Sequence, residues 1–133
     1  MAATETEIVI PARTKSLPES STAPAVRAAG EDWLCAWCLN RVAQEQDRFV
    51  YKGKDEFTFA NPEGIRFAII TFSQTRGCRE AGLPTLEYTW FSGHAWSYCL
   101  CAGCGQHLGW YYAGQHHFAG LIRDRMVRGC VRN

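Results

Sequence analysis

Two Cys-x-x-Cys pairs constrain this chain more than any other feature of its sequence. Cys35 and Cys38 form the first pair, and Cys101 and Cys104 form the second pair far downstream. A Cys-x-x-Cys turn lets two thiolates converge while backbone N–H groups point at the sulfur atoms. Two matched pairs predict one tetrahedral Zn²⁺ site that joins segments remote in sequence. Four protein ligands leave no open coordination position, so we expect this zinc to be structural and not catalytic.

The surroundings of the two pairs agree with a metal site. The chain has seven cysteines, an odd number that fits complete disulfide pairing poorly. Cys99 offers a third sulfur in the segment CLCAGC, but the spacing of Cys101 and Cys104 favours that pair as ligands and leaves Cys99 in the core. Trp33 and Trp37 are expected to pack around the first pair. Buried free cysteines or a redox pair are the alternative interpretation.

Charge and hydropathy argue against several classes of partner. The 133-residue chain has a formal net charge of +1, which gives no electrostatic case for nucleic acid or for an anionic membrane. No apolar run approaches the length of a membrane span. Glu5 and Glu7 stand where a signal peptide carries positive charge. We therefore expect a cytoplasmic protein with no nucleic-acid partner and no membrane partner.

Composition divides the chain into three parts. Residues 1–30 are rich in Ser, Thr, Ala and Pro and are expected to form a disordered N-terminal tail, residues 31–126 one domain, and residues 127–133 a C-terminal tail. Short apolar runs between Gly-rich turns predict a mostly β fold of antiparallel sheets. Strands are expected at residues 48–51, 57–60, 65–75, 86–91, 96–101, 107–112 and 118–122, with a turn at 61–64 and a loop at 76–85.

Large aromatic residues gather around the second cysteine pair. Trp90 and Trp96 flank the segment FSGHA, and Trp110 and Tyr112 are two residues apart on one expected strand, so these last two share a face. Converging beside the metal, such rings would form a small box with π-rich walls for a cation or a flat polar ring. Ordinary core packing is the alternative, and the residue types alone leave both open.

These residues resemble the CULT domain, the thalidomide-binding domain of cereblon, which also occurs as small stand-alone bacterial proteins. The runs YTWFSGHAW, CAGCGQHLGWYY and FAGLIRD carry the resemblance together with CAWC and ANPEG, and it covers about residues 33–124. It implies a zinc-pinned β-tent of two antiparallel sheets. It also implies a binding module for cyclic imides such as glutarimide and thalidomide-type compounds, with uracil-like rings as weaker mimics.

The resemblance further implies the roles of individual residues. The walls of a tri-tryptophan cage would be Trp90, Trp96 and Trp110, closed by Tyr112. The backbone of Tyr88, Thr89 and Trp90 would meet the imide edge, and Asn61, Pro62 and Phe67 would lie at the mouth. Tyr88 stands where cereblon has a histidine, which puts a side-chain bond to the second imide carbonyl in doubt. We expect no ubiquitin-ligase adaptor as a partner, and C-terminal cyclic imides of damaged proteins are one hypothesis for the natural ligand.

Two alternative functions differ in class from a binding module. Methionine sulfoxide reductase B proteins also have two zinc knuckles, an H-L-G stretch and a C-terminal catalytic cysteine, for which Cys130 is the candidate here. Arginines flank Cys130 and would lower the pKa of its thiol, but Trp110 follows HLG where the reductase has a histidine. An ordinary tail cysteine is therefore favoured, and we assign no catalytic residue. A zinc module that stacks a flipped base is disfavoured by the near-neutral charge.

Overall fold

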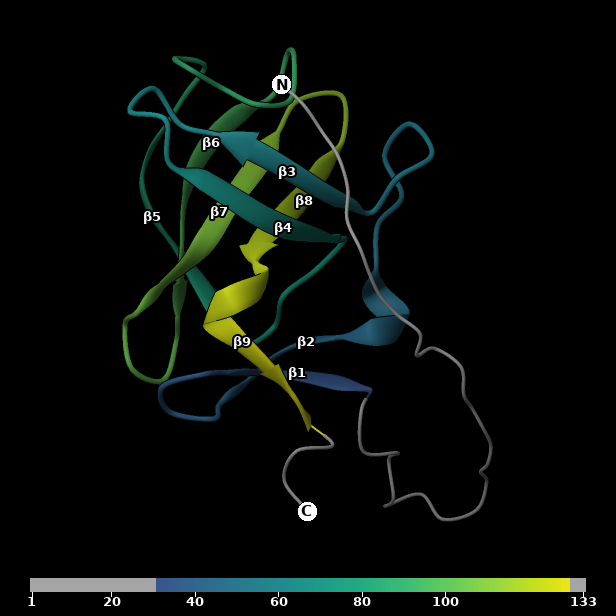
Figure 1. Ribbon diagram of the computed structural model, residues 1–133, viewed down its shortest axis with the longest axis vertical. Helices are drawn as coiled ribbons and strands as arrows, with labels where there is room; N and C mark the ends of the chain where they lie inside the picture. Colours follow the sequence, from purple (N-terminus) through teal and green to yellow (C-terminus); the bar gives the residue numbers. More distant parts are fainter. Residues whose placement is uncertain (1–30, 130–133) are drawn as a thin grey trace.

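Figure 1 shows the computed structural model, in which residues 31–129 are described. These residues form two antiparallel sheets, which confirms the predicted fold class. The smaller sheet has the order β2-β1-β9 and contains β1 (Asp32–Cys35), β2 (Arg41–Gln44) and β9 (Met126–Arg128). The larger sheet has the order β3-β4-β8-β7-β6-β5 and contains β3 (Glu56–Ala60), β4 (Arg66–Phe72), β5 (Cys78–Thr85), β6 (Ala95–Cys101), β7 (His107–Ala113) and β8 (His117–Ile122).

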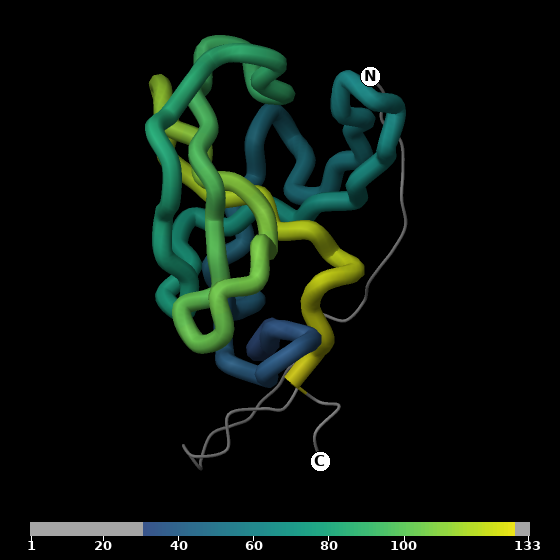
Figure 2. The backbone as a smooth tube through the Cα atoms, turned by 90° about the vertical axis from the view of Figure 1, so that its left-hand side faces the viewer, coloured from purple at the N-terminus to yellow at the C-terminus, as the bar shows by residue number. Residues whose placement is uncertain are grey.

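The small sheet lies at one end of the large sheet (Figures 1 and 2). Two short 3-10 turns help to connect them: η3 (Glu45–Asp47) follows β2, and η4 (Arg123–Arg125) leads from β8 into β9. Within residues 31–129 no helix has the length and hydrophobicity that crossing a membrane would require.

Strand alternation gives the large sheet two apolar faces. Ile70 and Leu121 face a core that the small sheet completes with Trp33 and Val42. The neighbouring residue Ile69 belongs to a second core on the opposite face, because successive side chains of a strand point to opposite sides. The second core contains the buried residues Ile69, Phe91, Tyr112, Phe118 and Ile122, and partly buried aromatic rings pack against it. The large sheet therefore separates an inter-sheet core from an aromatic one.

The structure reverses two adjacent expectations. Residues 76–85 were expected to form a loop because of their glycines and Pro84, but most of them form β5. An edge strand tolerates proline, and the β5–β6 register shifts between Ala81 and Thr85, where the chain bulges. Residues 86–91 were expected to be a strand, yet they form turns, with Tyr88 at φ 58°. The alternation of apolar residues in 86–91 thus predicted a strand in that segment, whereas the strand lies in the segment before it.

Two boundaries also differ from expectation. Val127 and Arg128 belong to the expected C-terminal tail but pair with β1 as part of β9. Residues 48–51 were expected to be a strand and instead make only isolated bridges, from Arg48 to Phe72 and from Tyr51 to Lys54. The expected N-terminal tail and Cys130 lie outside the described residues.

Trp33 ties β1 to the segment after β2. Its side chain is 3% exposed, as expected for packing, and its indole Nε1–H donates to Glu45 Oε1 at 2.7 Å. Trp37 was also expected to pack, but it is 54% exposed.

Replacing Trp33 by phenylalanine removes a donor to a carboxylate, so we expect the free energy of unfolding to fall by about 1.5 kcal/mol or more. Urea denaturation measures this, with Trp37→Phe as the matched control; equal midpoints for both variants would contradict the assignment.

Candidate metal centre and aromatic cluster

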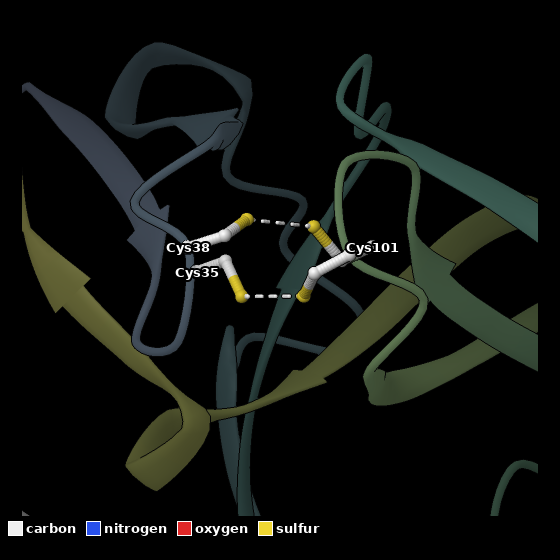
Figure 3. Close-up of side chains that lie close together, drawn as sticks. Cys35, Cys38 and Cys101 are labelled. Atoms are coloured by element: carbon white, nitrogen blue, oxygen red, sulfur yellow. Dashed lines mark hydrogen bonds between the residues drawn. The ribbon is translucent and has the colours of Figure 1, made fainter.

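Two tight turns from different sheets bring the four predicted cysteine ligands together. Cys35 ends β1 and Cys38 follows in the β1–β2 connection, while Cys101 ends β6 and Cys104 follows in the β6–β7 connection. Their four Sγ atoms lie within 4.8 Å of one another. Cys35 Sγ is 3.7 Å from Cys104 Sγ, and Cys38 Sγ is 3.6 Å from Cys101 Sγ. Figure 3 shows Cys35 and Cys38 facing Cys101 across the gap between the two turns.

This arrangement fits one tetrahedral ion. Zn–S bonds of about 2.3 Å in a regular tetrahedron place the sulfur atoms about 3.8 Å apart. The two shortest separations, 3.7 and 3.6 Å, are close to that value. Four cysteines close enough together to bind a metal ion are therefore present, and they match the predicted set. Cys99 is fully buried in the inter-sheet core outside this group, as predicted.

Backbone and amide N–H groups point at the sulfur atoms, as the spacing predicted. The N–H of Trp37 donates to Cys35 Sγ at 3.4 Å, and the N–H of Gly103 donates to Cys101 Sγ at 3.3 Å. Asn40 adds a side-chain donor to Cys101 Sγ at 3.6 Å and also donates to the Gly77 carbonyl at 3.0 Å. Such donors stabilise thiolates and orient them toward a shared ion.

The thiol pKa values show how the protons are distributed in the cluster without metal. Burial raises the pKa of Cys101, but hydrogen bonds from the backbone N–H groups of Cys104 and Gly103 outweigh it and lower the pKa to about 6. A backbone hydrogen bond near Asn40 lowers the pKa of Cys38, yet burial and the neighbouring sulfur atoms raise it to about 12. Cys38 therefore keeps its proton at neutral pH, and an incoming metal ion must displace it.

The second core carries an aromatic cluster at the positions predicted for ligand binding. Trp90 and Trp110 meet edge to face, with ring centroids 5.0 Å apart and planes at 76°. Phe67 meets Trp110 in the same manner at 5.5 Å. Phe59 on β3 stacks on Trp90 at 5.0 Å and 17°, a contact that the sequence analysis missed. The sequence predicted a strand over residues 57–60, but that prediction did not indicate which partner Phe59 would meet.

Trp96 flanks the same core by a different route. Its ring meets Tyr98 edge to face at 5.3 Å, and among residues 31–129 it has no ring contact with either Trp90 or Trp110. Both indole N–H groups are held by the backbone: Trp96 Nε1 donates to the Glu87 carbonyl at 2.8 Å, and Trp90 Nε1 donates to the Ala60 carbonyl at 3.1 Å. The N–H groups of these two indoles are thus already hydrogen-bonded within the protein.

Other residues predicted to bind ligand make packing contacts and hydrogen bonds within the protein. Tyr112 is 3% exposed and packs on Phe91 at 4.7 Å, and its burial raises the pKa of its hydroxyl. Asn61 Oδ1 accepts the N–H groups of Glu63 and Ile65 at 3.0 and 2.9 Å, which closes the predicted turn beside the exposed Pro62. These contacts leave the predicted ligand roles of Tyr112, Asn61 and Pro62 as predictions.

The loop before β6 presents backbone groups that are not hydrogen-bonded by any described residue. Thr89 Oγ1 donates to the His94 carbonyl at 2.6 Å and so holds the loop in shape. Tyr88 is 70% exposed with a positive φ. Among residues 31–129, the backbone N–H and C=O groups of Tyr88 and Trp90 have no hydrogen-bond partner. A donor and acceptors are therefore available immediately beside the Trp90 ring.

The fold and the site define a class: a small all-β domain whose two sheets meet at a four-cysteine cluster, with an aromatic cluster on the far face of the larger sheet. The chain is similar to cereblon proteins. It is 33% identical to chicken cereblon over 75 residues and 29% identical to Drosophila melanogaster cereblon over 87 residues, which are 52% and 63% of this chain. Xenopus tropicalis cereblon is 33% identical over 74 residues, or 51% of the chain.

The matched segment spans less than a fifth of each of these relatives, namely 17% of the chicken and Xenopus proteins and 15% of the Drosophila protein. No protein-family model matches the chain. The matches together with the cysteine cluster are consistent with a cereblon-type CULT domain and agree with the resemblance predicted from the sequence motifs.

Proposed function

We propose that this domain is a binding module for cyclic imides, held at the aromatic cluster by the backbone of Tyr88 and Trp90. The observation that carries the proposal is the set of unpaired backbone groups of these two residues beside the Trp90–Trp110 pair. An imide presents an acceptor, a donor and a second acceptor along one edge. A backbone C=O suits its N–H, and a backbone N–H suits one of its carbonyls.

The aromatic rings supply the remaining part of the recognition. Each backbone hydrogen bond contributes only about 1 kcal/mol net, so enclosure by Trp90, Trp96 and Trp110 must provide much of the affinity. Ring methylenes polarised by adjacent carbonyls pack favourably against indole faces. The hydrogen bonds from the indole N–H groups of Trp90 and Trp96 to backbone carbonyls support this role, because they hold both indoles in fixed orientations.

The proposal includes Zn²⁺ as the ion of the four-cysteine cluster. Thiolate ligands and sulfur separations near those of a ZnS₄ tetrahedron support this choice. Because four protein ligands complete the coordination, the ion would serve the fold and take no part in ligand chemistry. No residue of the described chain is assigned a catalytic role in this proposal.

Titration with glutarimide and with N-methylglutarimide tests the proposed recognition. We expect glutarimide to bind and to change the tryptophan fluorescence, whereas the methylated compound should bind at least about tenfold more weakly, because methylation removes the only donor of the imide edge and adds bulk. Equal affinity for the two compounds would show that the edge is not read in this way.

A second comparison addresses the natural ligand. We propose that the domain recognises peptides whose C-terminus has cyclised to an imide, since such an end presents the same edge as glutarimide. A peptide ending in a cyclic imide should bind, and the same peptide ending in the open amide should not. Similar binding of both peptides would restrict the proposal to free small molecules.

A further inference from the structure

His107 lies between the turn that carries Cys101 and Cys104 and the aromatic cluster. It begins β7, and its Nε2 lies 2.9 Å from the carbonyl oxygen of Gly109. On the other side of the ring, Nδ1 lies 3.4 Å from Nη1 of Arg125, which also donates to the His107 carbonyl at 2.8 Å. A carbonyl can only accept and a guanidinium can only donate. This pair of neighbours therefore fits one form of the ring: neutral, with its proton on Nε2.

The same ring touches Trp110, which belongs to the ligand site proposed above. His107 meets Trp110 edge to face, with centroids 5.1 Å apart and planes at 82°. It meets Tyr98 in the same way at 5.3 Å and 84°. Arg125 also lies over the ring of Phe67 at 6.0 Å, and Phe67 contacts Trp110 from another side. Two of the neighbours of Trp110 are thus held by one arginine on η4.

We propose that Arg125 and His107 are positioning residues for the ligand site: Arg125 holds His107 in its neutral Nε2–H form, and the neutral ring fixes the orientation of Trp110, so that protonation of His107 weakens ligand binding. This inference rests on the function proposed above. A protonated ring would carry an N–H at Nδ1 directed at the guanidinium of Arg125, with two positive charges in contact. The ring or the arginine must then move, and Trp110 loses the neighbour that supports it.

The electrostatic environment agrees with this geometry. Burial lowers the pKa of His107 below its ordinary value, and the charge of Arg125 lowers it further, against the opposing effect of the Gly109 carbonyl. Among the described residues, the ionisable groups in contact with the ring are Arg125 on η4 and Tyr98 on β6. Neutral His107 is thus the form present at pH 7, and the proposed loss of affinity occurs only on acidification below the ordinary range of a histidine.

Arg125→Gln is the first variant for testing this inference, with Arg123→Gln, an exposed arginine on the same turn, as the matched control. Imidazole ¹⁵N spectra of the metal-loaded protein should show the Nε2–H tautomer of His107 in the wild type. Removing the charge of Arg125 should raise the pKa of His107, while Arg123→Gln should leave it unchanged. Glutarimide affinity should fall at least about fivefold as His107 is protonated, at a midpoint that shifts upward in Arg125→Gln.

His107→Gln is the second variant, because its amide keeps a donor and does not titrate. Its glutarimide affinity should be independent of pH over the range in which the wild type changes, measured at pH values at which metal analysis shows that the ion is still bound. The inference is overturned if the wild type shows the Nδ1–H tautomer, if Arg125→Gln leaves the midpoint in place, or if affinity does not change as His107 titrates. The indole ¹H–¹⁵N signal of Trp110 should follow the titration of His107 without any ligand. Absence of glutarimide binding at every pH would therefore reject the proposed function, while this signal would still decide whether His107 positions Trp110.

Discussion

Cys101→Ser should abolish stoichiometric metal binding and leave the domain largely unfolded at 25 °C. Cys101 is fully buried, accepts N–H donors and belongs to the cluster that connects the β1–β2 turn to the β6–β7 turn. A Zn²⁺ ion bound by these four cysteines, as proposed above, would contribute an apparent binding free energy of about 10–16 kcal/mol, which is folding free energy when the unfolded chain has no preformed site. Since an entire native domain is stable by only about 5–15 kcal/mol, this loss is not compensated elsewhere.

Metal analysis and near-UV circular dichroism measure this outcome directly. Cys78→Ser is the matched control, because Cys78 on β5 pairs directly with Cys101 on β6 but lies outside the four-sulfur cluster. The control should keep one metal ion per chain and a cooperative melt. A strong chelator at pH 7, added to the wild type, should reproduce the effect of Cys101→Ser. If the metal-free protein melted at the same temperature as the metal-loaded one, the cluster would have no structural role.

Acidification should also release the metal, because it protonates the cysteine ligands. The raised pKa of Cys38, about 12, means that this sulfur is protonated without metal, and the pKa of Cys101, about 6, means that acid protonates this sulfur as well. Each proton competes with the ion for a ligand. The stability that the metal supplies is therefore present at neutral pH and is lost as the pH falls.

Trp96→Ala should lower the affinity for glutarimide by about 30-fold or more, corresponding to at least about 2 kcal/mol. Within residues 31–129, Trp96 makes a single ring contact, with Tyr98, and donates one hydrogen bond to the Glu87 carbonyl. Its removal therefore disturbs the fold less than removal of Trp90 or Trp110, each of which contacts several other rings. A loss of affinity in this variant reports on ligand enclosure more cleanly than a loss in the other two.

Isothermal titration calorimetry is the appropriate measurement, because the substitution itself changes tryptophan fluorescence. Trp37→Ala is the control: this tryptophan is 54% exposed in the metal-site turn and should keep the affinity of the wild type. The far-UV spectrum and melting temperature of both variants establish that they are folded. A folded Trp96→Ala protein that binds glutarimide as tightly as the wild type would remove Trp96 from the site.

Local spacing explains what the sequence could predict about the metal centre. A Cys-x-x-Cys turn sets the separation of its two sulfur atoms and the direction of its N–H groups within four residues, so Cys35, Cys38, Cys101 and Cys104 were identifiable before the fold was known. The preference for Cys101 over Cys99 followed from the same spacing and agrees with the observed cluster. The two-sheet antiparallel class was predictable as well, because short strands and Gly-rich turns leave few alternatives.

Spatial contacts between distant segments decided the rest. Phe59 reaches Trp90 because β3 pairs with β4 in the larger sheet, and a side chain's own sequence neighbours do not specify that pairing. Residues 78–85 became an edge strand although glycine and proline favour a loop, because β6 offered a hydrogen-bonding partner.

The contact between Arg125 and His107 exists only because η4 returns to the start of β7. The sequence by itself thus determined the four clustered cysteines and the β class, since both depend on short-range geometry. The tertiary structure alone decided which rings meet and which backbone groups remain unpaired, since these depend on how strands far apart in the chain pack.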